Sequence, residues 1–204
     1  PVIAVAIPLV AAGLILVLGD RLHENARECI TFAAAFSAAA AVYSLIPAAL
    51  AGEPLRVTLI EIVKGIKFEL FLDPAGMVFA CVASTLWVLT SLYSVGYMRG
   101  HHEKNQTGYF SAFAMCITAA LGLCFAANLI TFFIFFEILT VATYPLVVHY
   151  RDEKGAASGH KYLAYTLISG QIFFAGIVVV YVMTGTTDFT PGGFIKTDTI
   201  PMPW

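Results

Sequence analysis

The sequence predicts an all-α protein that crosses a membrane about six times and carries one short β-hairpin outside the membrane. Of the 204 residues, 59% are hydrophobic and only 12% are charged, whereas a soluble domain carries about 25% charged residues. The charges also gather in short islands between long apolar runs, which is the layout of a multi-span helical protein. An alternating stretch between the second and third runs predicts the hairpin.

Six apolar runs come close to the length that a spanning helix needs, about 20 residues. They are roughly Pro1–Leu18, Cys29–Leu50, Pro74–Met98, Tyr109–Ala127, Leu129–Tyr150 and Lys161–Thr184. The first run has no basic segment and no cleavage site, so it is expected to be a span and not a signal peptide. The expected domains are 1–52 (spans one and two), 53–73 (the hairpin), 74–185 (spans three to six) and 186–204 (an extracytoplasmic tail or linker).

The hairpin is predicted from two short segments, "RVTLIEIV" and "IKFELFL", which have the composition of strands. Lys64–Gly65 lies between them as a turn, and Lys67 and Glu69 alternate with apolar residues, which is the period-two pattern of a strand. Asp73–Pro74 then predicts a helix start, because Asp caps a helix and Pro suits its first turn.

Lysine and arginine counts predict the orientation. One side of the predicted membrane holds seven of these residues and the other holds four. The larger set is expected to lie on the cytoplasmic side of the inner (cytoplasmic) membrane. The N-terminus is then expected on the extracytoplasmic side. The seven are Arg21, Arg27, Arg99, Lys104, Arg151, Lys154 and Lys161, and the four are Arg56, Lys64, Lys67 and Lys196.

One carboxylate lies inside a predicted span. Among 13 acidic residues, only Glu137 falls within an apolar run, about 12 Å along the helix from Leu129 at 1.5 Å per residue. That depth is close to the middle of a hydrocarbon core about 30 Å thick, where a charge costs on the order of 2.5–3.5 kcal/mol. Glu137 is therefore expected to be protonated, paired or hydrated, and able to exchange a proton. The alternative is a structural carboxyl that bonds to a neighbouring helix.

The same run carries further polar features. Thr140 and Tyr144 follow Glu137 at i+3 and i+7, so a polar stripe is expected to point toward the cytoplasmic end. Pro145 has no N–H, which leaves the carbonyl of Val141 without its helical partner and able to hold a water. The alternative is a simple kink near the end of the helix.

The start of the last span supplies more candidates. Lys161 opens the span, and Tyr165 and Ser169 share its face. Lys161 can tune a carboxylate or pass protons on, and the alternative is an interface lysine whose stem lies along apolar surface. His149 and His160 bracket the preceding loop and can feed protons inward, since histidine titrates near neutral pH. The alternative for both is a solvated loop residue.

Other chemistry is not indicated. No spacing of His, Cys and carboxylates predicts a metal site, and no phosphate-binding loop or nucleophile motif appears. The four cysteines form no CxxC pair and are expected to be free thiols. The sequence therefore predicts no metal, no cofactor and no catalytic site of its own, and a net charge of −2 gives no reason to expect nucleic acid.

Two segments resemble a known family. "LITFFIFFEILTVATYPLVVH" and "GHKYLAYTLISGQ" resemble the antiporter-like large subunits of respiratory complex I and of Mrp-type cation/proton antiporters. "DPAGMVFACVASTLWVLTSLYSVGYMRG" and "FAANLITFFIFFEILTVATYPLV" look closest to the D-type subunit of Mrp antiporters and its relatives in membrane-bound hydrogenases. The resemblance covers about Asp73 to Gln171 and concerns the N-terminal part of the family.

The resemblance implies a fold and a mechanism. Family members have a fourteen-span core with two inverted five-helix repeats, spans four to eight and nine to thirteen, each with a broken, water-lined helix. A glutamate in span five pairs with a lysine in span seven. Glu137 matches that glutamate, and Lys161 matches a lysine that opens span six in many members. This chain stops after six spans, so it is expected to be a split subunit or a fragment that another segment completes, and a remnant kept as an assembly scaffold is the third explanation.

The predicted function is a membrane subunit that forms part of a proton or Na+/H+ translocation channel. Glu137 and Lys161 are the proton-transfer residues of this hypothesis, with accessory roles for Thr140, Tyr144, His149 and His160 and a kink at Pro145. The expected partners are other membrane subunits of an antiporter, respiratory or hydrogenase complex, including one that supplies span seven and the second repeat. The alternatives are a structural subunit with no transport path and a subunit of a redox-driven pump.

Overall fold

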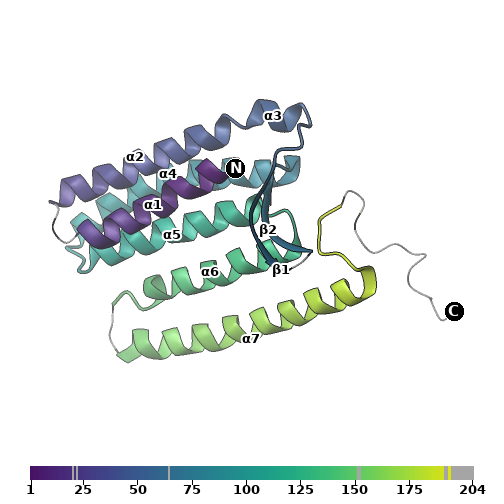
Figure 1. The fold of residues 1–204 in the computed structure, drawn as a ribbon. Coiled ribbons are helices and arrows are strands. Elements are labelled where there is room, and N and C mark those ends of the chain that lie inside the picture. The colour runs from purple at the N-terminus through teal and green to yellow at the C-terminus, as the bar shows by residue number, and fades with distance from the viewer. Residues whose placement is uncertain (20, 22, 64, 151–152, 191–192, 194–204) are drawn as a thin grey trace.

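The chain folds into a bundle of α-helices with a two-stranded sheet at one end (Figure 1). The computed structural model describes residues 1–204 except 20, 22, 64, 151–152, 191–192 and 194–204. The helices are α1 (Val2–Leu18), α2 (Glu24–Tyr43), α3 (Ile46–Leu50), α4 (Pro74–Gly100), α5 (Gln106–Cys124), α6 (Leu129–Val147) and α7 (Glu153–Thr184), and the strands are β1 (Arg56–Val63) and β2 (Ile66–Phe71).

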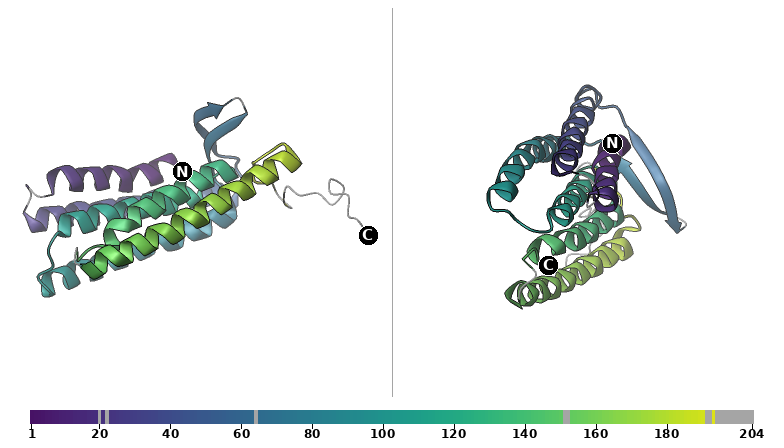
Figure 2. Two further views of the ribbon diagram at one scale, coloured as in Figure 1. Left: turned by 90° about the horizontal axis from the view of Figure 1, so that it is seen from below. Right: turned by 90° about the vertical axis from the view of Figure 1, so that its left-hand side faces the viewer.

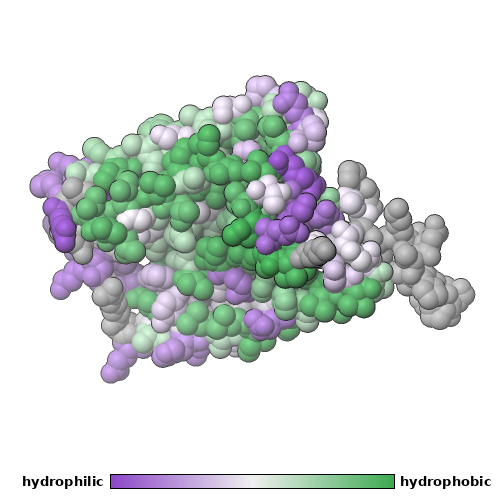
Figure 3. Space-filling view, in the orientation of Figure 1, coloured by the Kyte–Doolittle hydropathy of each residue, from purple (hydrophilic) through white to green (hydrophobic). Residues whose placement is uncertain are grey.

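The predicted multi-span helical fold is confirmed. Five helices within the described residues are long and apolar enough to cross a membrane, and α1 is a shorter apolar helix. The five are Glu24–Leu50, Pro74–Gly100, Gln106–Cys124, Leu129–Val147 and Gly155–Thr184. Figure 3 shows apolar side chains along the flank of the bundle and hydrophilic ones gathered near its two ends. This distribution fits a protein that stands across a bilayer.

Two element boundaries differ from the prediction. The second span begins at Glu24, five residues early, and is interrupted at Ser44–Leu45, just before a short helix with Pro47 in its first turn. The last helix begins at Glu153, so Lys161 lies inside α7 and does not open it. Hydropathy marks only the apolar part of a helix, whereas the polar residues before it, many of them good helix formers, continue the same helix.

Four helices pack together through small residues that surround one large side chain, that of Trp87. Trp87 of α4 is 1% exposed and is surrounded by buried alanines from α1, α2 and α5. Alanine lets helix backbones approach closely, which is typical of helix contacts in membranes. The alanines are Ala11, Ala12, Ala34, Ala35, Ala38 and Ala114. In contrast, α7 lies at the edge of the bundle and packs chiefly on α6 (Figure 2).

The predicted hairpin is present in the structure. β1 and β2 pair antiparallel, with Arg56 opposite Phe71 at the base, and Asp73 accepts hydrogen bonds from the first turn of α4. The predicted turn residue Lys64 lies outside the described residues. The alternating pattern predicts that Glu69 lies in a loop outside the membrane, where a side chain is usually exposed. In the structure Glu69 is only 5% exposed. The base of β2 is covered because its backbone bonds to the α5–α6 connection, from Phe71 N to Phe125 O at 2.7 Å.

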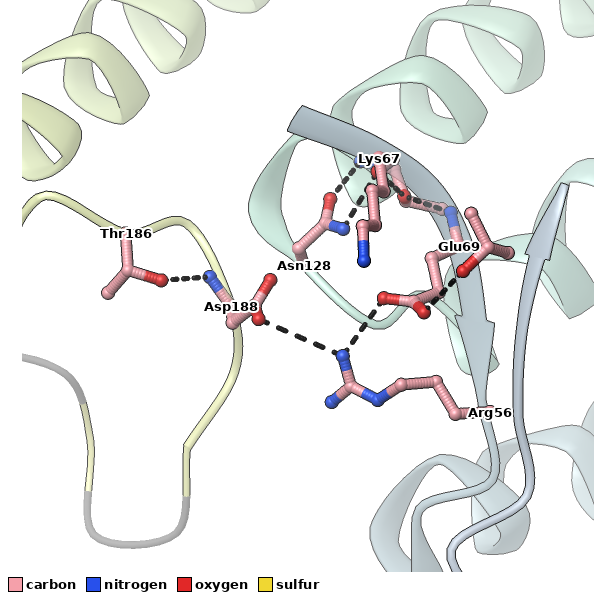
Figure 4. A network of polar contacts seen from close by, with 8 residues as sticks. Arg56, Lys67, Glu69, Asn128, Thr186 and Asp188 are labelled. Carbon is pink, nitrogen blue, oxygen red and sulfur yellow. Dashed lines mark hydrogen bonds and ion pairs between the residues drawn. The ribbon is translucent and has the colours of Figure 1, made fainter. Parts of the chain in front are cut away.

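A polar network at the hairpin base binds Glu69 and the chain that follows α7 (Figure 4). Arg56 lies between two carboxylates, with Nη1 2.9 Å from Glu69 Oε2 and 3.8 Å from Asp188 Oδ2. The hydroxyl of Thr58 donates to Glu69 Oε1 at 2.7 Å. Because both carboxylate oxygens of Glu69 have partners, its burial needs no further ligand.

The same end of the molecule fixes the start of α6. Asn128 caps the helix by accepting from Thr131 N at 2.8 Å, and its amide donates to Lys67 O at 2.9 Å. The hydroxyl of Thr131 accepts from Glu69 N at 3.0 Å. The hairpin therefore anchors the first turn of the helix that carries Glu137.

Candidate proton-transfer site

Glu137 lies near the middle of α6, between α5 and α7, eight residues after Leu129. Its Oε1 atom is buried and has no hydrogen-bond partner among the residues that the structure describes. Burying such an acceptor costs free energy, and the cost is far larger for a charged carboxylate than for a neutral carboxylic acid. Oε1 therefore needs a hydrogen-bond partner that the described residues do not supply.

Two acids are buried as whole residues in the described part of the chain, and both are paired. Glu28 of α2 is 6% exposed and accepts from Arg99 of α4 at 2.8 and 2.5 Å. Glu69 bonds to Arg56 at the hairpin base. The pairing explains why these two carboxylates are tolerated as structural groups. Glu137 differs from both because no described cation lies within ion-pair distance of it.

Gly170 of α7 faces the Glu137 carboxyl directly. A β-carbon at position 170 would overlap Oε1 and would lie 3.2 Å from Cδ and 3.7 Å from Oε2. Gly170 is itself buried. The carboxyl thus occupies space that exists only because residue 170 has no side chain.

An apolar pocket of about 330 Å³ lies beside the same glutamate. Its lining residues are Met115, Glu137, Ile138, Val141 and Ala142. Glu137 therefore contacts α7 through Oε1 and also lines this pocket. The space is large enough for water, which needs polar partners such as a carboxyl oxygen.

The predicted polar stripe is only partly available to Glu137. Thr140 is buried, and its hydroxyl donates within the helix to Phe136 O at 3.1 Å. The ring of Tyr144 packs against Gly159 of α7, where a β-carbon would lie 3.0 Å from Cε2. Both residues face the α6–α7 contact, but neither forms a hydrogen bond with Glu137 Oε1 in the described structure.

A hydroxyl pair that the sequence does not reveal joins α6 to α7. The hydroxyl groups of Thr143 and Tyr162 share a hydrogen bond, and Tyr162 Oη lies 3.4 Å from Thr140 O. Pro145 follows within the same helix, as predicted. Tyr162 gives no signal in the sequence because it follows Lys161 at the predicted start of the span, where a tyrosine is common at the membrane interface.

Lys161 lies away from Glu137. Nine residues separate it from Gly170, which is about two and a half turns at 3.6 residues per turn, so the two residues occupy opposite faces of α7. The Lys161 side chain is exposed, as is Tyr165 on the same face at 77%. Within the described residues no ion pair joins Lys161 to Glu137.

The two histidine candidates separate in the structure. His149 follows α6 and lies 3.9 Å through Nε2 from Glu103 Oε2, with the two side chains 13% and 16% exposed. Tyr150 donates to Glu103 Oε1 at 3.4 Å. His160 instead lies inside α7 and is exposed, which corrects its expected place in a loop. Glu103 gives no signal in the sequence because it is one acid in a polar connection.

The described ranges hold no group of three or more His, Cys, Asp or Glu side chains arranged to bind a metal ion. The four cysteines are free. The segment that contains α6 and α7 also matches a known protein family. Residues 126–195 match the family model described as NADH:quinone oxidoreductase/Mrp antiporter, transmembrane region.

The chain is homologous to subunits of Mrp antiporters. It is 29% identical over 133 residues to the A-type subunit of the Na+/H+ antiporter of Alkalihalophilus pseudofirmus, covering 65% of this chain and 16% of that protein. It is 28% identical over 122 residues to the A1-type subunit of the Na+/H+ antiporter of Staphylococcus aureus, covering 59% and 15%. The chain thus spans about a sixth of the length of these relatives.

Two solved structures share the fold. An archaeal respiratory membrane complex, the membrane-bound sulfane sulfur reductase, contains a chain with a TM-score of 0.77 and 19% identity, covering 92% of this chain and 38% of that one. The Mrp complex from Dietzia sp. contains one with a TM-score of 0.67 and 20% identity, covering 91% and 20%. The segment homologous to the family includes Glu137, Tyr162 and Gly170.

Proposed function

We propose that this chain forms part of a proton or Na+/H+ translocation path in a multisubunit membrane complex. The observation that carries the proposal is the Glu137 carboxyl, which lies in mid-span with a buried and unpartnered oxygen, among the described residues, inside the family-matched segment. Intramembrane acids of this kind are rare and commonly mark ion pathways. Homology to subunits of Mrp antiporters supports the same function.

In this proposal Glu137 binds a proton and releases it. The pocket beside Glu137 admits water from one side of the carboxyl. Thr143 and Tyr162 supply hydroxyl groups between Glu137 and the end of α6. The expected kink at Pro145 would line that route together with Thr140 and Tyr144. Hydroxyl groups can both donate and accept a hydrogen bond, which suits them to a chain of proton carriers.

We propose that protons reach this route from the end where α6 and α7 connect. His149 and Glu103 lie close together there, and an imidazole ring can both donate and accept a hydrogen bond. The lysine and arginine counts support an orientation in the inner membrane with this end in the cytoplasm and the hairpin on the outer side. His160 is exposed on α7 and is a secondary candidate for the same task.

The partner that completes the path is proposed to cover α7. Its uncovered surface carries Lys161 and Gln171 among apolar residues, and both side chains are exposed. Charged and amide groups are costly against lipid and are commonly buried against other helices. A further set of helices there would bury these groups and would give Lys161 a proton-transfer role next to the segment that follows this one in the path.

The test uses the complete complex that contains this chain, reconstituted in liposomes with a pH-sensitive dye and a sodium indicator. Glu137→Gln keeps the shape and removes the exchangeable proton, so we expect proton flux, with any coupled sodium flux, to fall at least about tenfold. Glu53→Gln is the matched control, since Glu53 is exposed before the hairpin. Unchanged flux in Glu137→Gln would reject the proposal.

A second function, that of an assembly scaffold, is favoured by one observation. Glu137 and Lys161 lie on different sides of α7 and are not paired in the described structure. If the chain is a scaffold, Glu137→Gln keeps full flux, whereas substitutions on the uncovered face of α7 release the chain from its complex. Copurification of neighbouring subunits with each variant separates the two functions.

A further inference from the structure

We propose that Gly170 is a positioning residue for Glu137, because it provides the space that fixes the carboxyl between α6 and α7. This inference rests on the proposed function, and it adds a second residue to the proton-binding group. Gly170 is buried on the face of α7 that meets α6. Its lack of a side chain is what lets Oε1 lie against the α7 backbone.

The glycines of α7 divide into two groups according to their faces. Gly159 and Gly170 are eleven residues apart, about three turns, so they share one face. A β-carbon at Gly159 would meet Val148 and Tyr144 of the α6 segment, and one at Gly170 would meet Glu137. Gly176 lies off this face and has nothing within 4 Å of a β-carbon. The absence of a side chain therefore matters at Gly170 and not at Gly176.

The contact at Gly170 constrains one end of the carboxyl. Oε1 is sealed against α7, whereas Oε2 lies farther from the glycine, at 3.7 Å from a β-carbon there. The carboxyl is thus held by one oxygen and can exchange its proton through the other. Proton transfer depends on hydrogen-bond geometry, so this fixed orientation decides whether the route beside Glu137 can be used.

Alanine at position 170 would move the carboxyl without breaking the fold. The atom it would overlap is the far end of a flexible side chain, so Glu137 can rotate away from α7. Alanine is also a better helix former than glycine by roughly 0.5–1 kcal/mol. The expected consequence is an assembled complex in which the proton-binding group is misplaced, and a misplacement of about 1 Å can cost on the order of 100-fold in rate.

The experiment compares four variants in the reconstituted complex: Gly170→Ala, Gly176→Ala, Glu137→Asp and Gly170→Ala with Glu137→Asp. We expect Gly170→Ala to assemble normally and to lose flux by about tenfold or more, while Gly176→Ala stays close to the parent. Aspartate is one methylene shorter and leaves room for the alanine. The double variant is therefore expected to carry more flux than Gly170→Ala alone.

A second measurement reads the carboxyl itself. Dicyclohexylcarbodiimide adds to a protonated carboxyl, and mass spectrometry of the peptide that contains Glu137 gives the labelling rate. Labelling is expected to be faster in Gly170→Ala than in Gly176→Ala, because the displaced carboxyl no longer lies buried against α7 and is more accessible to the reagent. A purely structural role for Gly170 would alter assembly without this change in labelling or a shift in the pH profile of flux.

The outcomes are distinguishable. If Glu137→Gln abolishes flux but Gly170→Ala matches Gly176→Ala in flux and labelling, the positioning role is overturned and the proposed function stands. If aspartate lowers flux by the same factor with glycine or alanine at position 170, the two residues are uncoupled and the positioning role is again overturned. If Glu137→Gln retains flux, the proposed function fails and this inference fails with it.

Discussion

Tyr162 of α7 and Thr143 of α6 share a hydrogen bond between their hydroxyl groups, two residues before Pro145. Thr143 also donates to Leu139 O at 3.0 Å, and Tyr162 Oη lies near Thr140 O. The cross-helix bond thus ties α7 to the part of α6 where the proline interrupts the backbone ladder. Farther along the same interface, α6 and α7 meet through aromatic contacts of Phe133 and Phe136 with Phe173 and Phe174.

Removing the Tyr162 hydroxyl tests that link. Tyr162→Phe keeps the ring and loses the bond to Thr143, so we expect the free energy of unfolding to fall by about 1 kcal/mol. Tyr165→Phe is the control, because Tyr165 is exposed on the next turn of the same helix. Thermal unfolding of the purified complex in detergent measures both. Equal melting temperatures for the two variants would show that the cross-helix bond contributes nothing to stability.

The Arg56–Glu69 pair leads to a prediction about the hairpin. Arg56→Ala would leave the Glu69 carboxylate buried with Thr58 as its remaining side-chain partner in the described structure. A buried acceptor that loses a charged partner costs about 1–3 kcal/mol. We expect the hairpin to open more often in this variant and to be cut faster by a protease added from its own side of the membrane.

Lys67→Ala is the control for Arg56→Ala. Lys67 lies on the paired strand with an exposed side chain, and its contribution to the network comes from its backbone carbonyl, which the substitution keeps. Its rate of cleavage is expected to match that of the parent. Equal cleavage of Arg56→Ala and Lys67→Ala would mean that the ion pair does not hold the hairpin in place.

Much of the fold could be predicted from the sequence because its signals are strong and local. Apolar runs of about 20 residues mark spans directly, and the alternation on either side of Gly65 marks the hairpin. The beginning of α7 could not be predicted, for a physical reason. Residues 153–160 carry charged, polar and small side chains and no large apolar one, so the hydropathy signal fades there although the helix continues.

The site could be predicted only in part. Glu137 stands out because a lone acid in an apolar run is costly and therefore informative. The roles of Gly170 and Tyr162 could not be predicted, because they depend on which face of α7 packs against α6. A sequence does not show which faces of two helices will meet. The type and position of Lys161 suggest a place near Glu137, yet the period of the helix puts it on the opposite face from Gly170.

The phenol of Tyr150 supplies a prediction about alkaline pH. A side-chain hydrogen bond with Tyr97, together with the charge of Glu103, raises the pKa of Tyr150 from 10.0 to about 12. The raised pKa means that the neutral phenol is favoured in the folded protein. Its contribution to stability is therefore complete below pH 10 and is lost as the pH rises through about 12.

Phenolate absorbance against pH measures this titration. The difference between the parent and Tyr150→Phe is expected to show phenol ionisation near pH 12. Tyr165→Phe, which removes an exposed phenol from α7, corrects for the general loss of one tyrosine. A difference curve with its midpoint at the ordinary value of 10.0 would contradict the expected contact with Tyr97 and Glu103.

Gly76 and Gly170 offer a comparison between two kinds of close approach. A β-carbon at Gly76 of α4 would overlap the backbone carbonyl of Cys124 and lie 3.1 Å from its carbon. This neighbour cannot rotate away as the Glu137 side chain can, so α4 and the end of α5 would have to separate. We expect Gly76→Ala to lower the free energy of unfolding by about 1–3 kcal/mol.

Gly96→Ala is the control on the same helix, since nothing lies within 4 Å of a β-carbon there. Alanine at position 96 is expected to leave stability unchanged or to raise it by roughly 0.5–1 kcal/mol through helix propensity. Thermal unfolding of both variants gives the comparison. If Gly76→Ala is as stable as Gly96→Ala, α4 and α5 can separate at little cost. The hairpin base, which is bonded to the same α5–α6 connection through Phe125, would then be held less rigidly than its hydrogen bonds indicate.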